Sequence, residues 1–305
     1  MFPFLFKRFL WMLLTLWIVF TVSFFLMRSV PGGPFDRERK MDPQIEANLR
    51  ARYRLDEPLW KQYVRCLAGT VCFDLGYSFT RADYTVNEVI AEGLPVSASL
   101  GILAMAIAIT VGLSAGIMSA VWKNTLFDNF VMTLATVGIA LPSFVVASLC
   151  IIFFVFLLNW FPAGGWGTLR QLILPAFCLG APYAAYIARL TRTGMLDVLS
   201  QDYIRTAWAK GLQPHTVILK HALKGALLPV VSYLGPAIAG VMTGSLVVEQ
   251  IFFIPGLGAH FIEAATQRDY TLAMGLVLLY TLLLYSMNTL VDITYGMIDP
   301  RVKLE

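Results

Sequence analysis

Long stretches without charge recur along this 305-residue chain, and they constrain its fold more than any other feature. Each is long enough to supply the roughly 20 mostly apolar residues that an α-helix needs to cross a bilayer. Composition agrees, because the chain is 58% hydrophobic and 14% charged, whereas soluble proteins are about 45–50% apolar and about 25% charged. We therefore expect an all-α polytopic membrane protein with six transmembrane helices. The six stretches lie at 9–27, 94–121, 130–158, 172–188, 227–248 and 272–291.

Charge and turn residues divide the chain into three parts. Residues 1–28 hold the N-terminus and the first span, whose apolar run is longer than the ~7–15 residues of a cleaved signal peptide. Residues 29–93 are polar and rich in turn signals, so we expect an extramembrane segment with short helices, such as one at 43–53. Residues 94–305 hold the other five spans and form the core.

Lysine and arginine in the short loops predict the orientation. Six spans place both termini on the same side, where the short loops and termini carry eleven of these residues; the short loops of the other side carry two. Cytoplasmic loops are enriched in Lys and Arg. We therefore predict cytoplasmic termini and an external segment at 29–93. The eleven residues are Lys7, Arg8, Lys123, Arg189, Arg192, Arg205, Lys210, Lys220, Lys224, Arg301 and Lys303.

The run Gly-Leu-Ser-Ala-Gly at 112–116 fits two patterns. G-x-S-x-G would make Ser114 a hydrolase nucleophile, which requires a strand–turn–helix elbow and a His/Asp partner. Gly-x-x-x-Gly allows two membrane helices to approach closely. The run lies within an apolar span, so we favour packing and keep a membrane-embedded serine hydrolase as an unfavoured alternative. A secondary transporter is a further alternative, although the later spans carry almost no charge of the kind its midplane site would use.

We expect neither a cofactor nor a metal on this chain. It has no G-x-x-x-x-G-K-[ST] phosphate loop, and its histidines and cysteines lack the spacing of metal ligands. Two of the four cysteines, Cys66 and Cys72, fall in the predicted external segment, where a disulfide can persist. The short loop between them allows a bridge, and two separate thiols are the alternative.

The segment 200–229 is basic and contains only one acidic residue, Asp202, although it lies between apolar runs. Ser200 is a plausible N-cap of a short helix. Gly211 is a natural stop, and Pro214 suits the first position of a second helix. The segment is therefore predicted to form a helix–Gly–helix that leads into the fifth span, either as a topology signal or as a docking element for a partner.

The same segment resembles the cytoplasmic coupling loop of binding-protein-dependent ABC importer permeases. The resemblance extends along nearly the whole chain and is greatest for the first of the two permease subunits of bacterial oligopeptide importers. The usual Glu-Ala-Ala start is replaced by Arg205-Thr206-Ala207, as in the peptide branch of that family. The other matching stretches are SFFLMRSVPGGPF, GLPVSASLG, ALPSFVVA, FPAGGW, VVEQIFFIPGLG and RDYT.

This resemblance implies a type I ABC importer permease in a bacterial inner membrane, with surrounding lipid. Its partners would be a second homologous permease, two cytoplasmic ATPase subunits and an external peptide-binding protein, with peptide as the substrate and no nucleic acid. The chain itself would be non-catalytic, and ATP would be hydrolysed on the partner chains. The coupling loop would span 189–226 and contact the ATPase through Arg205, Thr206, Ala207, Ala209, Lys210 and Gly211. An external loop turn would be formed by Glu249, Pro255, Gly256 and Gly258.

Overall fold

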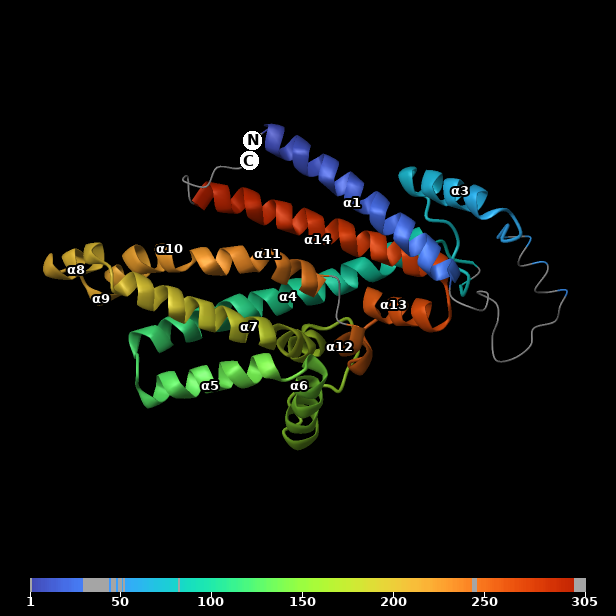
Figure 1. The fold of residues 1–305 in the computed structure, drawn as a ribbon. Coiled ribbons are helices and arrows are strands. Elements are labelled where there is room, and N and C mark those ends of the chain that lie inside the picture. Colours follow the sequence, from blue (N-terminus) through green and yellow to red (C-terminus); the bar gives the residue numbers. More distant parts are fainter. Residues whose placement is uncertain are drawn as a thin grey trace. The chain divides into compact units, whose positions relative to one another are not determined.

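The computed structural model describes residues 2–29, 44, 48, 51, 53–81, 83–242 and 246–298, and these are almost entirely helical (Figure 1). One isolated antiparallel bridge, between Tyr77 and Thr85, is the only strand-like pairing among them. Most of the predicted helix at 43–53 lies outside the described residues. In chain order the helices are α1 (Phe2–Ser29), α3 (Leu59–Val71), α4 (Val86–Val121), α5 (Leu126–Ala140), α6 (Ser143–Cys150), the π-helix η1 (Ile151–Leu157), α7 (Leu169–Leu199), α8 (Asp202–Ala209), α9 (Pro214–Thr216), the π-helix η2 (Val217–Ala222), α10 (Leu223–Ala226), α11 (Leu228–Met242), α12 (Leu246–Ile251), α13 (Leu257–Thr266) and α14 (Tyr270–Ile298).

Five described segments are long and apolar enough to cross a membrane, and they match five of the six predicted spans. The third predicted span is different, because α5 and the following α6–η1 segment are bent by 113°. Leu141 and Pro142 form the break. A residue before proline avoids helical geometry, and Leu141 is extended, with φ −81° and ψ 129°. The predicted span at 130–158 is therefore a bent pair of helices, and the described residues hold six spans if this pair counts as one.

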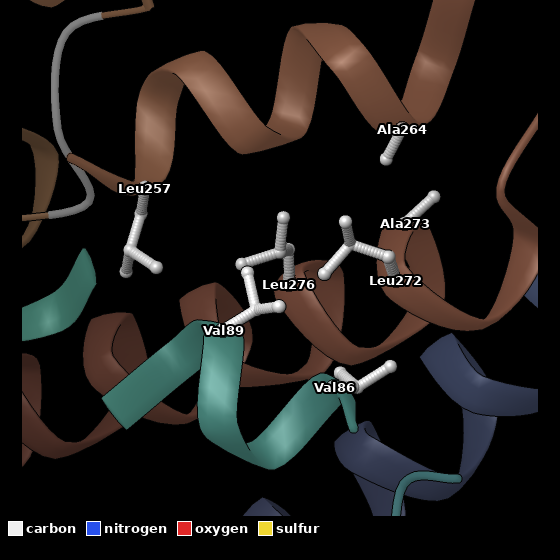
Figure 2. Close-up of a cluster of buried hydrophobic side chains, with 7 residues drawn as sticks. All are labelled: Val86, Val89, Leu257, Ala264, Leu272, Ala273 and Leu276. Carbon is white, nitrogen blue, oxygen red and sulfur yellow. The ribbon is translucent and has the colours of Figure 1, made fainter. Parts of the chain in front are cut away.

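The chain forms two compact units, which are described separately. The first contains residues 1–96 and 255–285. One of its hydrophobic cores joins α4, α13 and α14, and Figure 2 shows these side chains pointing toward one another. The members are Val86, Val89, Leu257, Ala264, Leu272, Ala273 and Leu276.

A buried carboxylate orders the start of α14 within this unit. Asp269 accepts hydrogen bonds from the backbone N–H of Leu272 at 3.0 Å and from that of Thr80 at 3.1 Å. The hydroxyl of Ser78 also donates to it. The first contact is that of a helix N-cap. The same side chain thus caps α14 and holds the 78–80 turn, which explains why the Asp of RDYT suits this position.

The second unit contains residues 97–254 and 286–305. Helix α4 lies close against α7 in this unit, and the two glycines at 112 and 116 stand at that contact. A Cβ on Gly112 would lie 2.7 Å from the carbonyl oxygen of Ala184, and one on Gly116 would lie 2.6 Å from that of Ala188. Ser114 is exposed. The Gly-x-x-x-Gly interpretation therefore describes the actual helix contact.

An ion pair fastens the start of α5 to α7 in the same unit. The Arg192 guanidinium donates to both carboxylate oxygens of Asp128, at 2.7 and 2.8 Å. Asp128 is almost fully buried and also accepts hydrogen bonds from the Ser119 hydroxyl and from the backbone N–H of Asn124. A bidentate pair of this kind has a fixed geometry. It therefore sets the position of the α4–α5 turn on α7.

Candidate docking surface

The basic segment folds as the predicted helix–turn–helix at the end of α7 (Figure 1). Helix α8 ends in a Schellman motif, in which Gly211 N–H donates to Trp208 O at 2.9 Å and Leu212 N–H donates to Ala207 O at 3.4 Å. Gly211 has φ +73°, the left-handed conformation that glycine adopts without strain. Pro214 then occupies the first turn of α9, as predicted. The chain continues through η2 and α10 toward α11.

The predicted N-cap of α8 was wrong. Ser200 is the C-cap residue of α7, and its hydroxyl donates to the backbone oxygen of Asp197 at 2.7 Å. Gln201 stands at the N-cap of α8 without a capping side-chain hydrogen bond. Because α7 continues to Leu199, eleven residues beyond the predicted end of the fourth span, the serine is already engaged with the preceding helix.

The inner face of α8 packs on its own subunit. Ile204 is fully buried and Ala207 is only 7% exposed, in a core that includes residues of α4, α7, η2 and α10. The buried members are Ala120, Met195, Ile204, Ala207, Val217, Ala222 and Ala226. The expectation that Ala207 contacts an ATPase directly is therefore corrected, because its methyl group is used to seat α8 on α7.

The outer face of the helix–turn–helix is apolar and basic. Three large side chains are strongly exposed: Tyr203 at 51%, Trp208 at 44% and Leu219 at 58%. Arg205, Thr206, Ala209, Lys210 and Gly211 are exposed on or beside the same helix. The Arg205 guanidinium lies 3.4 Å from the carboxylate of Asp202, in an ion pair with both side chains largely exposed; such a pair adds little stability. We call the exposed residues 203, 205, 208–212 and 219 the docking face.

The four residues predicted to form an external turn have different roles. Glu249 lies in α12 and is fully buried, where its carboxylate accepts a hydrogen bond from the Ser97 hydroxyl at 2.8 Å. Because it is part of a helix, Glu249 is not a turn residue. Its hydrogen bond to Ser97 offsets part of the cost of burying a carboxylate. Pro255 and Gly256 immediately precede α13, with Gly256 at its N-cap. Gly258 is buried in the first turn of α13.

Two motifs of the family resemblance meet in the second unit. The backbone N–H of Gly165, in FPAGGW, donates to the carbonyl oxygen of Phe252 at 2.8 Å. A Cβ on Gly164 would lie 2.4 Å from the same oxygen. The glycine pair is thus required for the close approach of this loop to the end of α12.

The hypothesised disulfide is absent. Cys66 and Cys72 are free thiols, because the segment between them continues α3 instead of turning back. Six residues of helix rise by about 9 Å, whereas a disulfide requires Cα atoms about 4.4–6.8 Å apart. Burial raises the pKa of the Cys66 thiol, against the opposing effect of Arg28, while Cys72 is exposed.

Sequence reasoning missed the aromatic part of the docking face and the burial of Glu249. No role was predicted from the sequence for Tyr203 or Trp208. Their exposure follows from Ile204 and Ala207, which are three residues apart and define the buried side of α8, since residues i and i+3 share a helix face. For Glu249 the signal was a lone carboxylate at the edge of an apolar span, which has to be paired.

Comparison with known proteins relates the chain to membrane transport components. Residues 112–304 match the family described as binding-protein-dependent transport system inner membrane component, and residues 1–101 match its N-terminal counterpart. The chain is 46% identical over 305 residues to the oligopeptide transport system permease protein OppB of Haemophilus influenzae, covering 99% of this chain and 100% of that protein. The values for OppB of Escherichia coli K12 are the same. The dipeptide transport system permease protein DppB of Bacillus subtilis is 44% identical over 298 residues, covering 98% of this chain and 97% of that protein.

Solved structures show the same fold at low sequence identity. A structure of the MetNI methionine ABC transporter in an inward-facing conformation superposes with a TM-score of 0.56 and 17% identity. The match covers 69% of this chain and 96% of that chain. The helices described above therefore have the arrangement of an ABC importer permease.

Proposed function

The chain belongs to the family of binding-protein-dependent transport system inner membrane components and is a peptide transport permease subunit, and on that premise we propose how it is coupled to ATP. Two separate cytoplasmic ATPase subunits would bind below it and a second homologous permease, and a peptide-binding protein would deliver peptide from outside. Peptide would cross between the two permeases toward the cytoplasm. The docking face is the part of this chain that we assign to the ATPase.

The observation that carries this assignment is the exposure of aromatic side chains on a rigid basic element. Tyr203 and Trp208 stand outward from α8, and Trp, Tyr and Arg are the residue types that dominate binding energy at protein interfaces. The helix that presents them is fixed by its buried face on α7. A partner that binds the docking face is therefore attached to an element that is packed on α7.

This attachment also suggests how motion would reach the spans. Met195, on α7, belongs to the same core as Ile204 and Ala207 of α8. On the other side of Gly211, α9, η2 and α10 lead within a few residues into α11. When ATP binding draws the ATPase pair together, the docking face would carry α7 and α11 with it. Access to the peptide pathway would then alternate between the two sides of the membrane.

The same proposal fixes the orientation. An ATPase uses cytoplasmic ATP, so the docking face and both termini would be cytoplasmic and the segment at 29–93 external. The Lys and Arg bias of the short loops supports this orientation. Arg301 and Lys303, which contribute to that bias, lie outside the described residues. Labelling a cysteine placed at Asn48 from outside intact cells tests the assignment.

The docking face can be tested by removing its aromatic side chains. The double variant Tyr203→Ala/Trp208→Ala should weaken ATPase association about 30-fold, the equivalent of one hot spot of about 2 kcal/mol. Leu126→Ala is the matched control, since Leu126 is 88% exposed at the start of α5, beyond the docking face. ATPase subunits that still co-purify fully with the double variant, at normal uptake, would contradict the assignment.

A second pair of variants tests the turn itself. Gly211→Val should abolish coupling, because a β-branched residue is strained at φ +73°. Gly211→Asn should retain it, since Asn tolerates this conformation. No atom lies within 4 Å of the added Cβ, so the difference between the two variants reports backbone strain and not a clash.

A further inference from the structure

Helix α3 presents a continuous apolar stripe for which the described part of the first unit provides no cover. Trp60, Val64, Ala68 and Val71 are all exposed, and their spacing places them on one side of a helix. Trp60 is 64% exposed and Val71 is 72% exposed. Phe73, immediately after the helix, is 82% exposed. We call these five residues the α3 stripe.

The end of α3 is built so that Phe73 projects outward. Phe73 N–H donates to Thr70 O at 3.1 Å and Asp74 N–H donates to Gly69 O at 2.8 Å, which is a Schellman motif. Phe73 occupies the position that normally belongs to glycine, with φ +58°. A bulky residue in this region is an outlier that calls for an explanation. The amide of Asn87 holds the strained residue by donating to its carbonyl oxygen at 2.6 Å.

The opposite face of α3 packs on α1, and the position of this contact along α1 shows how deep in the membrane it lies. Tyr63 packs against the aromatic side chains of α1, with its hydroxyl 2.9 Å from the Thr21 hydroxyl and its ring stacked on Phe25. Thr21 lies eight residues before the end of α1 at Ser29, about 12 Å along the helix. The headgroup layer on each side of a bilayer is only about 5–8 Å thick. Tyr63 therefore reaches the hydrocarbon depth of the span formed by α1.

The polar contacts of α3 lie closer to the end of α1, where the membrane surface is expected. Gln62 is buried and accepts a hydrogen bond from Arg28 Nε at 3.2 Å, close to the end of α1. Its amide donates to the backbone oxygens of Leu55 and Glu57. The helix thus has polar groups toward the headgroup side and aromatic contacts toward the hydrocarbon, as expected for a helix that lies in a membrane interface.

We propose that the α3 stripe is inserted into the acyl-chain region of the outer leaflet, so that α3 is an interfacial membrane helix and not a free external element. The lipid-facing surface of α1 leads onto it, because Phe25 is 48% exposed and stacks on Tyr63. Lys61 is exposed next to Trp60 with its ammonium over the indole ring, a pairing suited to anionic headgroups at the rim. The proposal requires that α1 crosses the membrane. The stripe is assigned to the outer leaflet because residues 29–93 are proposed to be external.

The test places a fluorophore on the stripe in the assembled transporter. Val64→Cys, in a background without the four native cysteines, is labelled with nitrobenzoxadiazole and the complex is reconstituted in phosphatidylcholine nanodiscs. Val22→Cys on α1, which is 50% exposed and close to Thr21, is the lipid reference, and Asp83→Cys, at an exposed turn, is the aqueous reference. Val71→Cys provides a second position on the stripe, and ATP-driven peptide uptake by cells that carry each variant confirms that the variant is folded.

The Val64 label should be quenched by acyl-chain doxyl lipids as strongly as the Val22 label, and iodide should quench it several-fold less than the Asp83 label. Added peptide-binding protein should change neither value. Iodide quenching equal to that of Asp83 would overturn the proposal. Protection from both quenchers, or protection that appears only with the binding protein, would also overturn it and would assign the stripe to a protein partner. If doxyl lipids did not quench the Val22 label, α1 would not be in contact with lipid acyl chains and the proposal would fall. This outcome is independent of whether docking-face variants lose their ATPase.

Discussion

Replacing Gly116 with valine should force α4 and α7 apart. The new Cβ would lie 2.6 Å from Ala188 O and 2.6 Å from the Cβ of Thr191, whereas ordinary contact begins at 3.4 Å. Because a backbone oxygen cannot rotate away, the helices have to separate by the missing 0.8 Å, the difference between 3.4 and 2.6 Å. A gap of about 0.5–1 Å already removes a quarter to a half of the dispersion energy of the contacting atoms. Overpacking of this kind typically costs about 1–3 kcal/mol.

The measurement is the thermal unfolding of the purified subunit pair, scanned at one fixed rate because membrane proteins often unfold irreversibly. Ser114→Val is the matched control, since it places the same side chain two residues away on the exposed side of α4. We expect Gly116→Val to lower the unfolding temperature by several degrees and Ser114→Val to leave both the temperature and peptide uptake unchanged. Equal unfolding temperatures for the two variants would refute the packing argument, and loss of uptake in Ser114→Val would reopen a chemical role for the serine.

Three further predictions concern charge and thiols. Asp128→Asn should destabilise the subunit by about 1.5–3 kcal/mol, because it leaves Arg192, 24% exposed, without its carboxylate; an unchanged unfolding midpoint would contradict this. Burial lowers the pKa of His260, and a neighbouring arginine adds to the effect. The unfolded chain therefore binds more protons than the folded chain below about pH 6.5, so the free energy of unfolding should fall as the pH falls through this value. His260→Gln should reduce that loss of stability, and a pH profile identical to that of the unsubstituted protein would exclude His260 as its cause. Maleimide should label exposed Cys72 faster than Cys66, whose pKa is raised by burial; labelling of Cys66 first would contradict the structure.

Most of the architecture could be predicted from the sequence because membrane spans are long apolar runs, and five of them appear close to where hydropathy places them. The bend after α5 was missed although its cause is visible as Leu141-Pro142. Proline inside a span can be accommodated, as Pro175 and Pro182 are within α7. Hydropathy does not distinguish these outcomes, because the choice depends on which neighbouring groups satisfy the freed backbone.

The candidate site was predicted in outline but not in the direction of its side chains. Gly211 and Pro214 carry local backbone preferences, so the turn could be located from the sequence alone. Ser200 was assigned to the wrong helix because helix boundaries within a continuous polar segment are poorly marked. Ala207 was assigned outward because burial depends on what the rest of the chain supplies, here the core on α7, and no local pattern specifies that partner. The remaining parts of the proposal, namely the ATPase contact and the binding protein, depend on chains other than this one.

The most direct test of the account is peptide uptake by proteoliposomes that contain this subunit with its second permease. The account predicts that uptake requires internal ATP, both ATPase subunits and the external binding protein, and that Tyr203→Ala/Trp208→Ala strongly reduces it while Leu126→Ala does not. Uptake that proceeds at the full rate without the ATPase subunits, driven by an ion gradient, would contradict the account and identify the chain as a secondary transporter.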